Sequence, residues 1–249
     1  MCAGRRHLAD RTTQFEKALI GLRTLVLRGA FETNTRLSEV ALAERLGISR
    51  TPLRQALDRL VDEGLLERIE TGGTRVARFT LDDINDAIEL RGVVEGMGAR
   101  LAAERGVSPG LLGEAERVLD GIDNAIGTEG FIDLAAYVRQ NAAFHALLAR
   151  MAGSSIVQRE VERVGRTPLA SPSSFLKEQE LIPDFHASLV RAQWQHRAIL
   201  AAIRAREGAR AEALTREHAR LARENLEHFA NAGPSIATRV PGLSLVATD

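Results

Sequence analysis

Apolar residues in the first part of the chain recur every three or four positions, in successive groups separated by glycine. The first group predicts a helix that ends at Gly29, after a polar start that we treat as a flexible arm over residues 1–14. The second group predicts a short helix that Ser38 caps and Gly47 ends. The third group predicts a helix that runs up to Gly64. We therefore expect three helices in this part of the chain.

The third predicted helix begins directly after a tight turn, and a hairpin follows it. Ser49 or Thr51 can cap this helix, and Pro52 is tolerated in its first turn. Residues 65–79 predict two short strands around a pair of glycines. Two helices across a glycine turn, followed by such a hairpin, form a winged helix-turn-helix. The second helix of that motif places its first residues in the major groove of DNA.

The rest of the chain keeps a helical period and shows no alternating strand pattern. Short breaks divide it into about six helices, expected near residues 82–97, 111–126, 132–151, 154–164, 183–206 and 209–231. Short turns between helices predict an antiparallel all-α bundle, a fold that builds ligand and metal sites from inward-facing side chains. The expected fold is thus mainly α, with a DNA-binding domain over 15–80, a bundle over 81–231 and a loose tail over 232–249.

Length and composition fit such a protein. The 249 residues are 45% hydrophobic, which is enough to bury a core in one or two domains. A single cysteine, Cys2, excludes a disulfide framework and a zinc site made of several cysteines. No apolar run is long enough to cross a bilayer, and the first ten residues lack the apolar core of a signal peptide. We therefore expect a cytoplasmic protein with no membrane partner.

The formal net charge of zero hides a difference between the two predicted domains. Residues 1–80 contain 14 Arg/Lys and 10 Asp/Glu, a balance of +4, whereas residues 81–249 contain 19 and 23, a balance of −4. A basic first domain joined to an acidic remainder is typical of a small nucleic-acid-binding module on a larger domain that does not bind nucleic acid.

The start of the third helix carries side chains suited to DNA. Ser49 and Thr51 can donate hydrogen bonds to phosphates, while Arg50 and Arg54 can pair with phosphate or reach a guanine edge. The exposed amides of a helix start add an anion site. Taken singly, these residues are as readily caps and a solvated face. Their order within helix, glycine turn, helix and hairpin favours a role in DNA binding.

The sequence of this region resembles the DNA-binding domain of the GntR family of bacterial regulators. The resemblance rests on Leu37-Ser38-Glu39, on the run from Leu42 to Arg54 and on Ala56-Leu57 and Leu60, and it covers about residues 15–80. It implies that Arg50, Thr51 and Arg54 contact operator DNA and that Gly72 and Gly73 lie at the wing tip, near the minor groove. Val40 stands where some relatives place a DNA-contacting arginine.

Three histidines in the predicted bundle could share one site. Asn141 and His145 are four residues apart and project from one helical face, as two ligands of one metal would. His196 lies 12 residues before Gly208 and His218 lies 10 after it, so the helical hairpin places both at similar depth. A lone histidine on a helix is more often an ordinary packed or solvated side chain.

These histidine patterns resemble the FCD effector domain of the FadR branch of GntR regulators. The resemblance rests on residues 141–148, 196–203 and 213–218 and spans about residues 85–230. It implies a divalent metal, with zinc or nickel favoured, held by His145, His196 and His218 and by the position of Asn141, where metal-binding members usually have aspartate. A neutral amide lowers the expected metal affinity and raises the attraction of the site for an anionic effector.

Other residues of the bundle leave alternatives open. Arg91 and Glu95 form either an i,i+4 pair on the surface or a site in which Arg91 clamps an effector carboxylate. The aromatic side chains could line the pocket or belong to the core; they are Phe144, Tyr137 and Trp194. The Pro/Ser-rich stretch 166–175 resembles vanillate-responsive members of the branch, so an aromatic acid such as vanillate is the first effector to consider.

The leading hypothesis is a repressor that binds a two-fold symmetric operator as a homodimer and is released by a small carboxylate effector. One recognition helix reads too few base pairs alone, which is why a dimer is expected. The alternative is a helical metalloenzyme that uses a three-histidine site. Against it, the sequence shows no HExxH, nucleophile elbow, P-loop or carboxylate base beside the histidines. An architectural DNA-binding protein would leave the large bundle without a role. We expect no enzyme activity.

Overall fold

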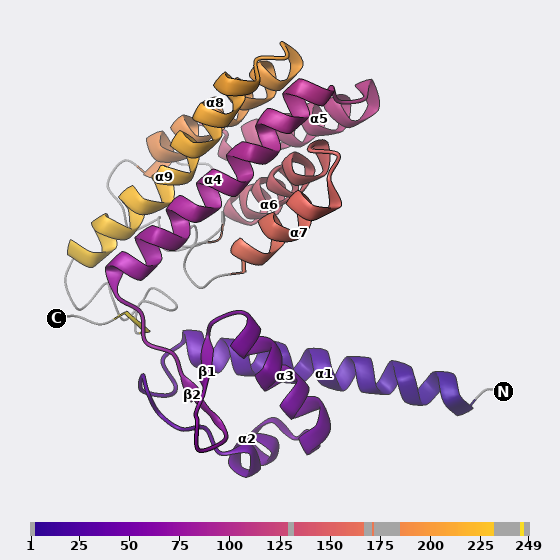
Figure 1. Cartoon of the computed structure of the whole chain (residues 1–249), viewed down its shortest axis with the longest axis vertical. Helices are drawn as coiled ribbons and strands as arrows, with labels where there is room; N and C mark the ends of the chain where they lie inside the picture. The colour runs from indigo at the N-terminus through magenta and orange to yellow at the C-terminus, as the bar shows by residue number, and fades with distance from the viewer. Residues whose placement is uncertain (1–2, 129–131, 167–170, 172–184, 232–244, 247–249) are drawn as a thin grey trace. The chain divides into compact units, whose positions relative to one another are not determined.

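The computed structural model describes the chain over residues 3–128, 132–166, 171, 185–231 and 245–246. The described chain divides into two compact units (Figure 1). The first contains residues 1–82 together with 240–249, and the second contains residues 83–239. No helix among the described residues has the length and apolar character needed to cross a membrane.

The first unit contains three helices and a two-stranded antiparallel sheet, which are α1 (Ala3–Leu27), α2 (Glu39–Leu46), α3 (Arg50–Asp62), β1 (Leu66–Arg68) and β2 (Thr74–Val76). Helix α3 packs against α1, α2 and β1. The core of the unit consists of aliphatic side chains from all of these helices and both strands, among them Leu22, Val26, Leu42, Leu53, Leu57, Leu60, Leu66 and Val76. Most of the apolar positions that predicted the helices form this core, although Val40 of α2 is exposed.

The boundaries of α2 and α3 follow the predicted caps. The Oγ of Ser38 accepts a hydrogen bond from the amide of Ala41 at 3.4 Å, which satisfies one free donor of the first turn of α2. Gly47 ends α2 in a left-handed conformation, with φ of 64°, that side chains with a Cβ rarely adopt. Ser49 is the N-cap of α3, but its side chain makes no capping hydrogen bond.

The hairpin pairs Leu66 with Val76 and Arg68 with Thr74. Its tip turns through Gly72 and Gly73, whose φ angles are 94° and 90°, so both positions require the conformational freedom of glycine. This hairpin is the wing of a winged helix-turn-helix.

The structure describes parts of both ends of the chain. The sequence predicts a flexible arm over 1–14, whereas in the structure α1 begins at Ala3, and residues 5–20 contain no proline or glycine that would interrupt the helix. The sequence also predicts a loose tail over 232–249. Most of that range lies outside the described residues, but Leu245 is buried in the core of the first unit and its carbonyl accepts a 2.9 Å hydrogen bond from the amide of Phe79.

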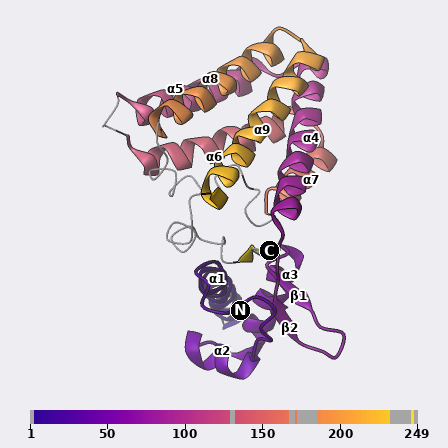
Figure 2. The same ribbon diagram turned by 90° about the vertical axis from the view of Figure 1, so that its left-hand side faces the viewer.

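The described part of the second unit is an all-α bundle of six helices, α4 (Leu81–Arg105), α5 (Pro109–Ile126), α6 (Leu134–Met151), α7 (Ser155–Val164), α8 (Phe185–Arg204) and α9 (Gly208–Asn231). Helix α5 packs against α6 and α8, and α8 pairs with α9 as a hairpin (Figures 1 and 2). The predicted mainly α fold is confirmed. Of the Pro/Ser-rich stretch 166–175, only Arg166 and Ser171 belong to the described residues.

Helices α4 and α9 lie close together because α4 carries glycine at their contact. A Cβ at Gly92 would come within 2.9 Å of the Cβ of Ala219, and one at Gly96 would come within 3.1 Å of the Cγ of Arg216. The pattern of Gly92 and Gly96 thus brings the backbone of α9 next to α4. This approach places the carbonyl of Ala219 within 3.3 Å of the Nη2 of Arg91.

Candidate metal centre and nucleic-acid interface

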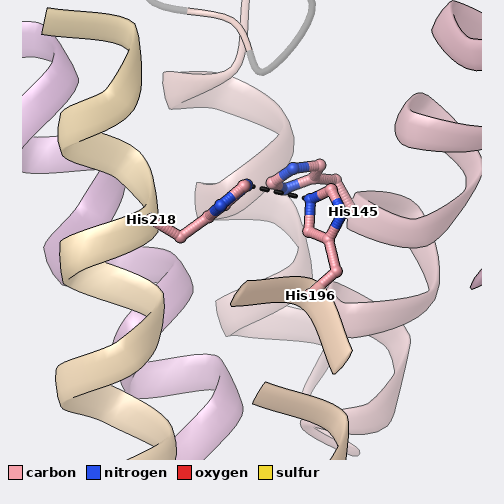
Figure 3. A group of neighbouring side chains, drawn as sticks. All are labelled: His145, His196 and His218. Carbon is pink, nitrogen blue, oxygen red and sulfur yellow. Dashed lines mark hydrogen bonds between the residues drawn. The ribbon is translucent and has the colours of Figure 1, made fainter. Parts of the chain in front are cut away.

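Three histidines meet inside the bundle. His145 comes from α6, His196 from α8 and His218 from α9, and all three side chains are buried (Figure 3). One ring nitrogen of each lies within 4.8 Å of one ring nitrogen of the others. The Nε2 atoms of His196 and His218 are 2.9 Å apart. The hairpin of α8 and α9 does place these two histidines at the same depth, and α6 supplies the third.

The outer nitrogens of two of these rings face amide oxygens. The Nδ1 of His196 lies 3.2 Å from the Oε1 of Gln193, and the Nδ1 of His218 lies 3.0 Å from the Oε1 of Gln195. Neither ring nitrogen of His145 has a hydrogen-bond partner among the described residues. The three rings therefore turn nitrogen atoms toward one another in a buried space.

Burial keeps two of the histidines neutral. Burial lowers the pKa of His196 and of His218 well below the ordinary value; His145 lowers that of His196 further, and His196 and then His145 lower that of His218. A neutral imidazole is the form that binds a metal ion. His196 and His218 therefore offer neutral nitrogen donors.

Arg91 and Glu95 lie beside this cluster. Their side chains are only 2% and 3% exposed, so the interpretation as a surface pair is wrong. The Oε1 of Glu95 is 3.4 Å from the Nδ1 of His145. The expectation that no carboxylate lies beside the histidines is therefore also wrong. Glu95 is 50 positions away from His145 in the sequence, and only the packing of the bundle brings the two together.

Burial and the neighbouring charges act in opposite senses on the pKa of Glu95 and on that of Arg91. Burial raises the pKa of Glu95, but the effects of His145 and Arg91 together are larger, so this pKa lies below its ordinary value. Burial lowers the pKa of Arg91, and Glu95 counteracts part of that change. The Nε and Nη1 of Arg91 and the Oε2 of Glu95 have no hydrogen-bond partner among the described residues. These atoms can therefore bind a ligand or water.

A groove between α6 and α7, with a volume of about 400 Å³, reaches His145, one member of the cluster. Glu95 and His145 line this groove, and Arg150 and Arg166 border it. The small side chains of three alanines on α6 leave it wide; they are Ala142, Ala146 and Ala149. We call this space the α6–α7 groove. Its volume is within the range of small-molecule sites.

The remaining predicted site residues are placed as follows. Asn141 is buried on α6, one turn before His145 and on the same helical face. The ring of Phe144 lies 4.7 Å from that of His196, centre to centre, so Phe144 belongs to the surroundings of the cluster. Tyr137 is part of the hydrophobic core. Trp194 is 69% exposed and is neither a core residue nor a wall of the site.

The donor set fits a divalent metal ion. Ligand nitrogens bound at about 2.0–2.1 Å from one ion lie about 3.0–3.4 Å from one another, close to the spacing of the His196 and His218 Nε2 atoms. The rings of both are fixed by hydrogen bonds at the opposite nitrogen, as is usual for metal-binding histidines. One ring nitrogen of His145 lies within 4.8 Å of those of the other two rings and supplies a third donor.

The start of α3 presents polar and basic side chains to solvent. Ser49, Arg50 and Thr51 are exposed, and the side chain of Arg54 is 64% exposed. The Nε of Arg54 donates to the Oε2 of Glu39 at 2.7 Å, a contact that the sequence did not predict. The polar and basic side chains at the start of α3 are therefore accessible to solvent, although Arg54 is paired with Glu39.

A basic residue from outside the hairpin, which the sequence did not mark, lies at the tip of the wing. Arg36 is exposed, and its Nη2 donates to the carbonyl of Gly72 at 2.9 Å. A Cβ at Gly73 would lie 3.4 Å from the Nε of Arg36. The guanidinium thus stands at the wing tip, although 36 positions separate it from Gly72 in the sequence, which is why no local motif marked it.

Comparison with known families identifies both units. The model of the FCD domain matches residues 86–221, more than half of the chain, and the model described as bacterial regulatory proteins of the GntR family matches residues 17–76. The chain belongs to the GntR family of bacterial regulators. As a GntR regulator with an FCD domain, it is a DNA-binding transcriptional regulator, and the expectation of a regulator and not an enzyme is confirmed.

Individual GntR regulators are similar over most of this chain. The transcriptional repressor GlaR of Escherichia coli K12 is 28% identical over 206 residues, which is 79% of this chain and 88% of GlaR. Two solved structures share the fold. McbR/YncC of E. coli has a TM-score of 0.60 at 21% identity, over 86% of this chain and 96% of that one. Lar of Listeria monocytogenes has a TM-score of 0.62 at 17% identity, with the same coverage.

Proposed function

We propose that this regulator is a repressor whose bundle binds a divalent metal ion and a small carboxylate effector, and that the effector releases it from its operator. The observation that carries this proposal is the meeting of three buried histidines, one of which, His145, lines a groove of small-molecule size. A ligand site of this kind inside the effector domain gives a DNA-binding protein a chemical signal to respond to. GlaR, which is similar over most of the chain, is named as a repressor.

The metal would be held by His145, His196 and His218, with Asn141 as a neutral fourth donor one turn from His145. Imidazole ligands suit zinc or nickel. When bound, such an ion supplies positive charge that attracts the carboxylate of the effector. The four proposed donors are neutral groups. Glu95 adds one negative charge beside His145, and Arg91 balances that charge.

The chain's own residues orient the effector around that charge. The Nε and Nη1 of Arg91 are buried donors that can bind a carboxylate oxygen. The alanines along the α6–α7 groove leave space for the body of the effector, and Arg150 stands at its border. An aromatic acid such as vanillate is the first candidate, because its ring would occupy the wide, largely apolar part of this groove.

On the DNA side, Ser49, Arg50, Thr51 and Arg54 would contact the operator from α3, with Gly72 and Gly73 at the wing tip. One such helix reads few base pairs, so a homodimer on a two-fold symmetric operator is the arrangement that gives adequate specificity. The effector acts by favouring the state of the dimer that fits the operator less well. A chromosomal operator requires the protein to work in the cytoplasm.

A binding experiment on the full chain tests this proposal. Small aromatic and aliphatic carboxylates, vanillate first, are added with and without Zn²⁺ while the melting temperature and the operator mobility shift are recorded. We expect at least one acid to stabilise the protein and to release DNA only when the ion is present, because a ligand that binds the folded state stabilises it by mass action.

Two variants serve as test and control in the same assay. His145→Ala should abolish the response, whereas His186→Ala, which changes a half-buried histidine on α8 outside the cluster, should retain it. A response that survives in His145→Ala would contradict the role of the cluster.

A further inference from the structure

We propose that Gln193 and Gln195 are positioning residues that set the tautomers of His196 and His218, and that Gln195 lets His218 exchange between a metal-binding and a metal-free tautomer. The inference rests on the metal site proposed above. It assigns a role to two glutamines that flank the cluster and that no motif in the sequence marked.

The amide of Gln193 is held in one orientation. Its Nε2 donates to the carbonyl of Leu119 and to the Oδ1 of Asp123, each at 2.8 Å. Both partners are oxygens, so the atom that faces them must be the NH₂ group. Asp123 is held in turn by an ion pair with Arg197. The amide therefore cannot turn without losing both hydrogen bonds.

This orientation fixes the tautomer of His196. The Oε1 of Gln193 faces the Nδ1 of His196, and an amide oxygen only accepts hydrogen bonds. The Nδ1 must therefore carry the ring's proton. The Nε2 of this neutral ring then carries a lone pair that points toward His218.

Gln195 faces His218 in the same way but is not held. Its Oε1 lies 3.0 Å from the Nδ1 of His218, and this is the sole hydrogen bond that the described residues give its side chain. With this orientation, His218 also carries its proton on Nδ1. Two bare Nε2 atoms would then face each other at 2.9 Å, and two lone pairs at that distance repel unless a cation lies within reach of both.

Without an ion, rotation of the Gln195 amide relieves the repulsion between the two Nε2 lone pairs. If the amide of Gln195 turns over, its NH₂ group donates to the Nδ1 of His218, and the single proton of that ring resides on Nε2. His218 can then donate to the Nε2 of His196 across the same 2.9 Å. No proton is gained or lost, because each neutral ring keeps one. Gln193 thus keeps His196 in the metal-binding tautomer, while Gln195 allows His218 to change its tautomer.

A carboxylate at position 195 would remove this freedom, because both of its oxygens accept hydrogen bonds. The variant Gln195→Glu should keep the proton of His218 on Nδ1 even without metal and should bind Zn²⁺ about 10-fold or more tightly than the wild type. The variant Gln193→Leu should bind it about 10–100-fold more weakly, as is typical when the partner of a metal-binding histidine is lost. Gln140→Glu adds the same charge on α6, where the side chain of Gln140 lies beside Gly121 of α5, and should change the Zn²⁺ affinity little.

The test combines two measurements on the full chain. Nitrogen-15 NMR of histidine-labelled protein, assigned with single-histidine variants, shows the tautomer of each ring, and a chelator competition gives the Zn²⁺ affinity. In metal-free wild type we expect the proton on Nδ1 of His196 and on Nε2 of His218. On addition of Zn²⁺ the proton of His218 should appear on Nδ1, as it should in metal-free Gln195→Glu.

The outcomes separate this inference from the proposed metal site. A proton on Nδ1 of His218 in the metal-free wild type, or an unchanged tautomer in Gln195→Glu, would overturn the inference whether or not Zn²⁺ binds. Failure of the wild type to bind Zn²⁺, with the expected metal-free tautomers present, would overturn the metal site and leave the tautomer assignment supported.

Discussion

Arg91 and Glu95 stand one turn apart on α4 with both side chains buried, and the Nε of Arg91 lies 4.0 Å from the Oε2 of Glu95. Buried opposite charges stabilise one another only while both are present. The pair therefore places a fixed cation and a fixed anion at the edge of the histidine cluster without adding net charge to the interior.

Removal of one member of this pair should destabilise the bundle strongly. Arg91→Met leaves Glu95 buried without a counter-ion, and the expected loss is about 3–5 kcal/mol in the free energy of unfolding. The double variant Arg91→Met with Glu95→Leu should regain most of that loss, because no unpaired charge remains. Chemical denaturation followed by circular dichroism, in the presence of a chelator, measures both. Equal stability of the single and double variants would show that the two charges do not interact.

The exposed arginines of α3 should act on DNA binding and not on stability. Arg50→Ala and Arg54→Ala should each weaken operator binding, by about 1–3 kcal/mol where the arginine contacts a guanine. The pair of Arg54 with Glu39 is exposed and contributes little to folding, so the melting temperature should barely change. Mobility-shift titration gives the affinity, with Arg28→Ala at the end of α1 as control. Unchanged affinity in both α3 variants would refute the assignment of the recognition helix.

The residues near the carboxyl end should matter for the winged unit. Leu245 is fully buried among the core residues of that unit, so Leu245→Ala should lower its stability by about 2–5 kcal/mol. Val246 is only half-buried, and Val246→Ala is the matched control. Hydrogen exchange of the amides in α1 and α3 reports the effect. Identical exchange in the two variants would mean that this contact does not hold the unit together.

The glycines of α4 should be intolerant of a side chain. In Gly92→Ala the new Cβ would meet Ala219 at 2.9 Å, so α4 and α9 must separate. We expect a loss of about 1–3 kcal/mol in stability, as is typical of overpacking. In Gly110→Ala nothing lies within 4 Å of the new Cβ, and removing a helical glycine should stabilise α5 by up to about 1 kcal/mol. Thermal melts distinguish the two; a stabilised Gly92→Ala would contradict the close packing of α4 on α9.

The elements of this fold are predictable from the sequence because they depend on local signals. Apolar spacing and glycine ends define the helices, and Ser38 with Gly47 sets the bounds of α2. Even the depth of His196 and His218 follows from their distances to one turn, since a helical hairpin converts sequence spacing into position.

What the sequence did not predict depends on contacts between distant segments. Glu95 meets His145 only because the bundle brings their helices together, and an i,i+4 pattern such as that of Arg91 and Glu95 is equally compatible with a surface. Likewise, Leu245 returns to the first unit from the far end of the chain. Local periodicity in the sequence does not predict contacts between residues that are far apart in the chain.

The most direct test of the proposed centre is the metal content of the full chain. Protein purified without chelator is analysed by mass spectrometry for zinc, nickel and other divalent metals, as wild type, His145→Ala and His186→Ala. We predict about one ion per chain in the wild type and in His186→Ala, and little in His145→Ala, because a buried site that loses one of three imidazoles loses most of its affinity. A wild type without metal, or an equal content in His145→Ala, would contradict the account.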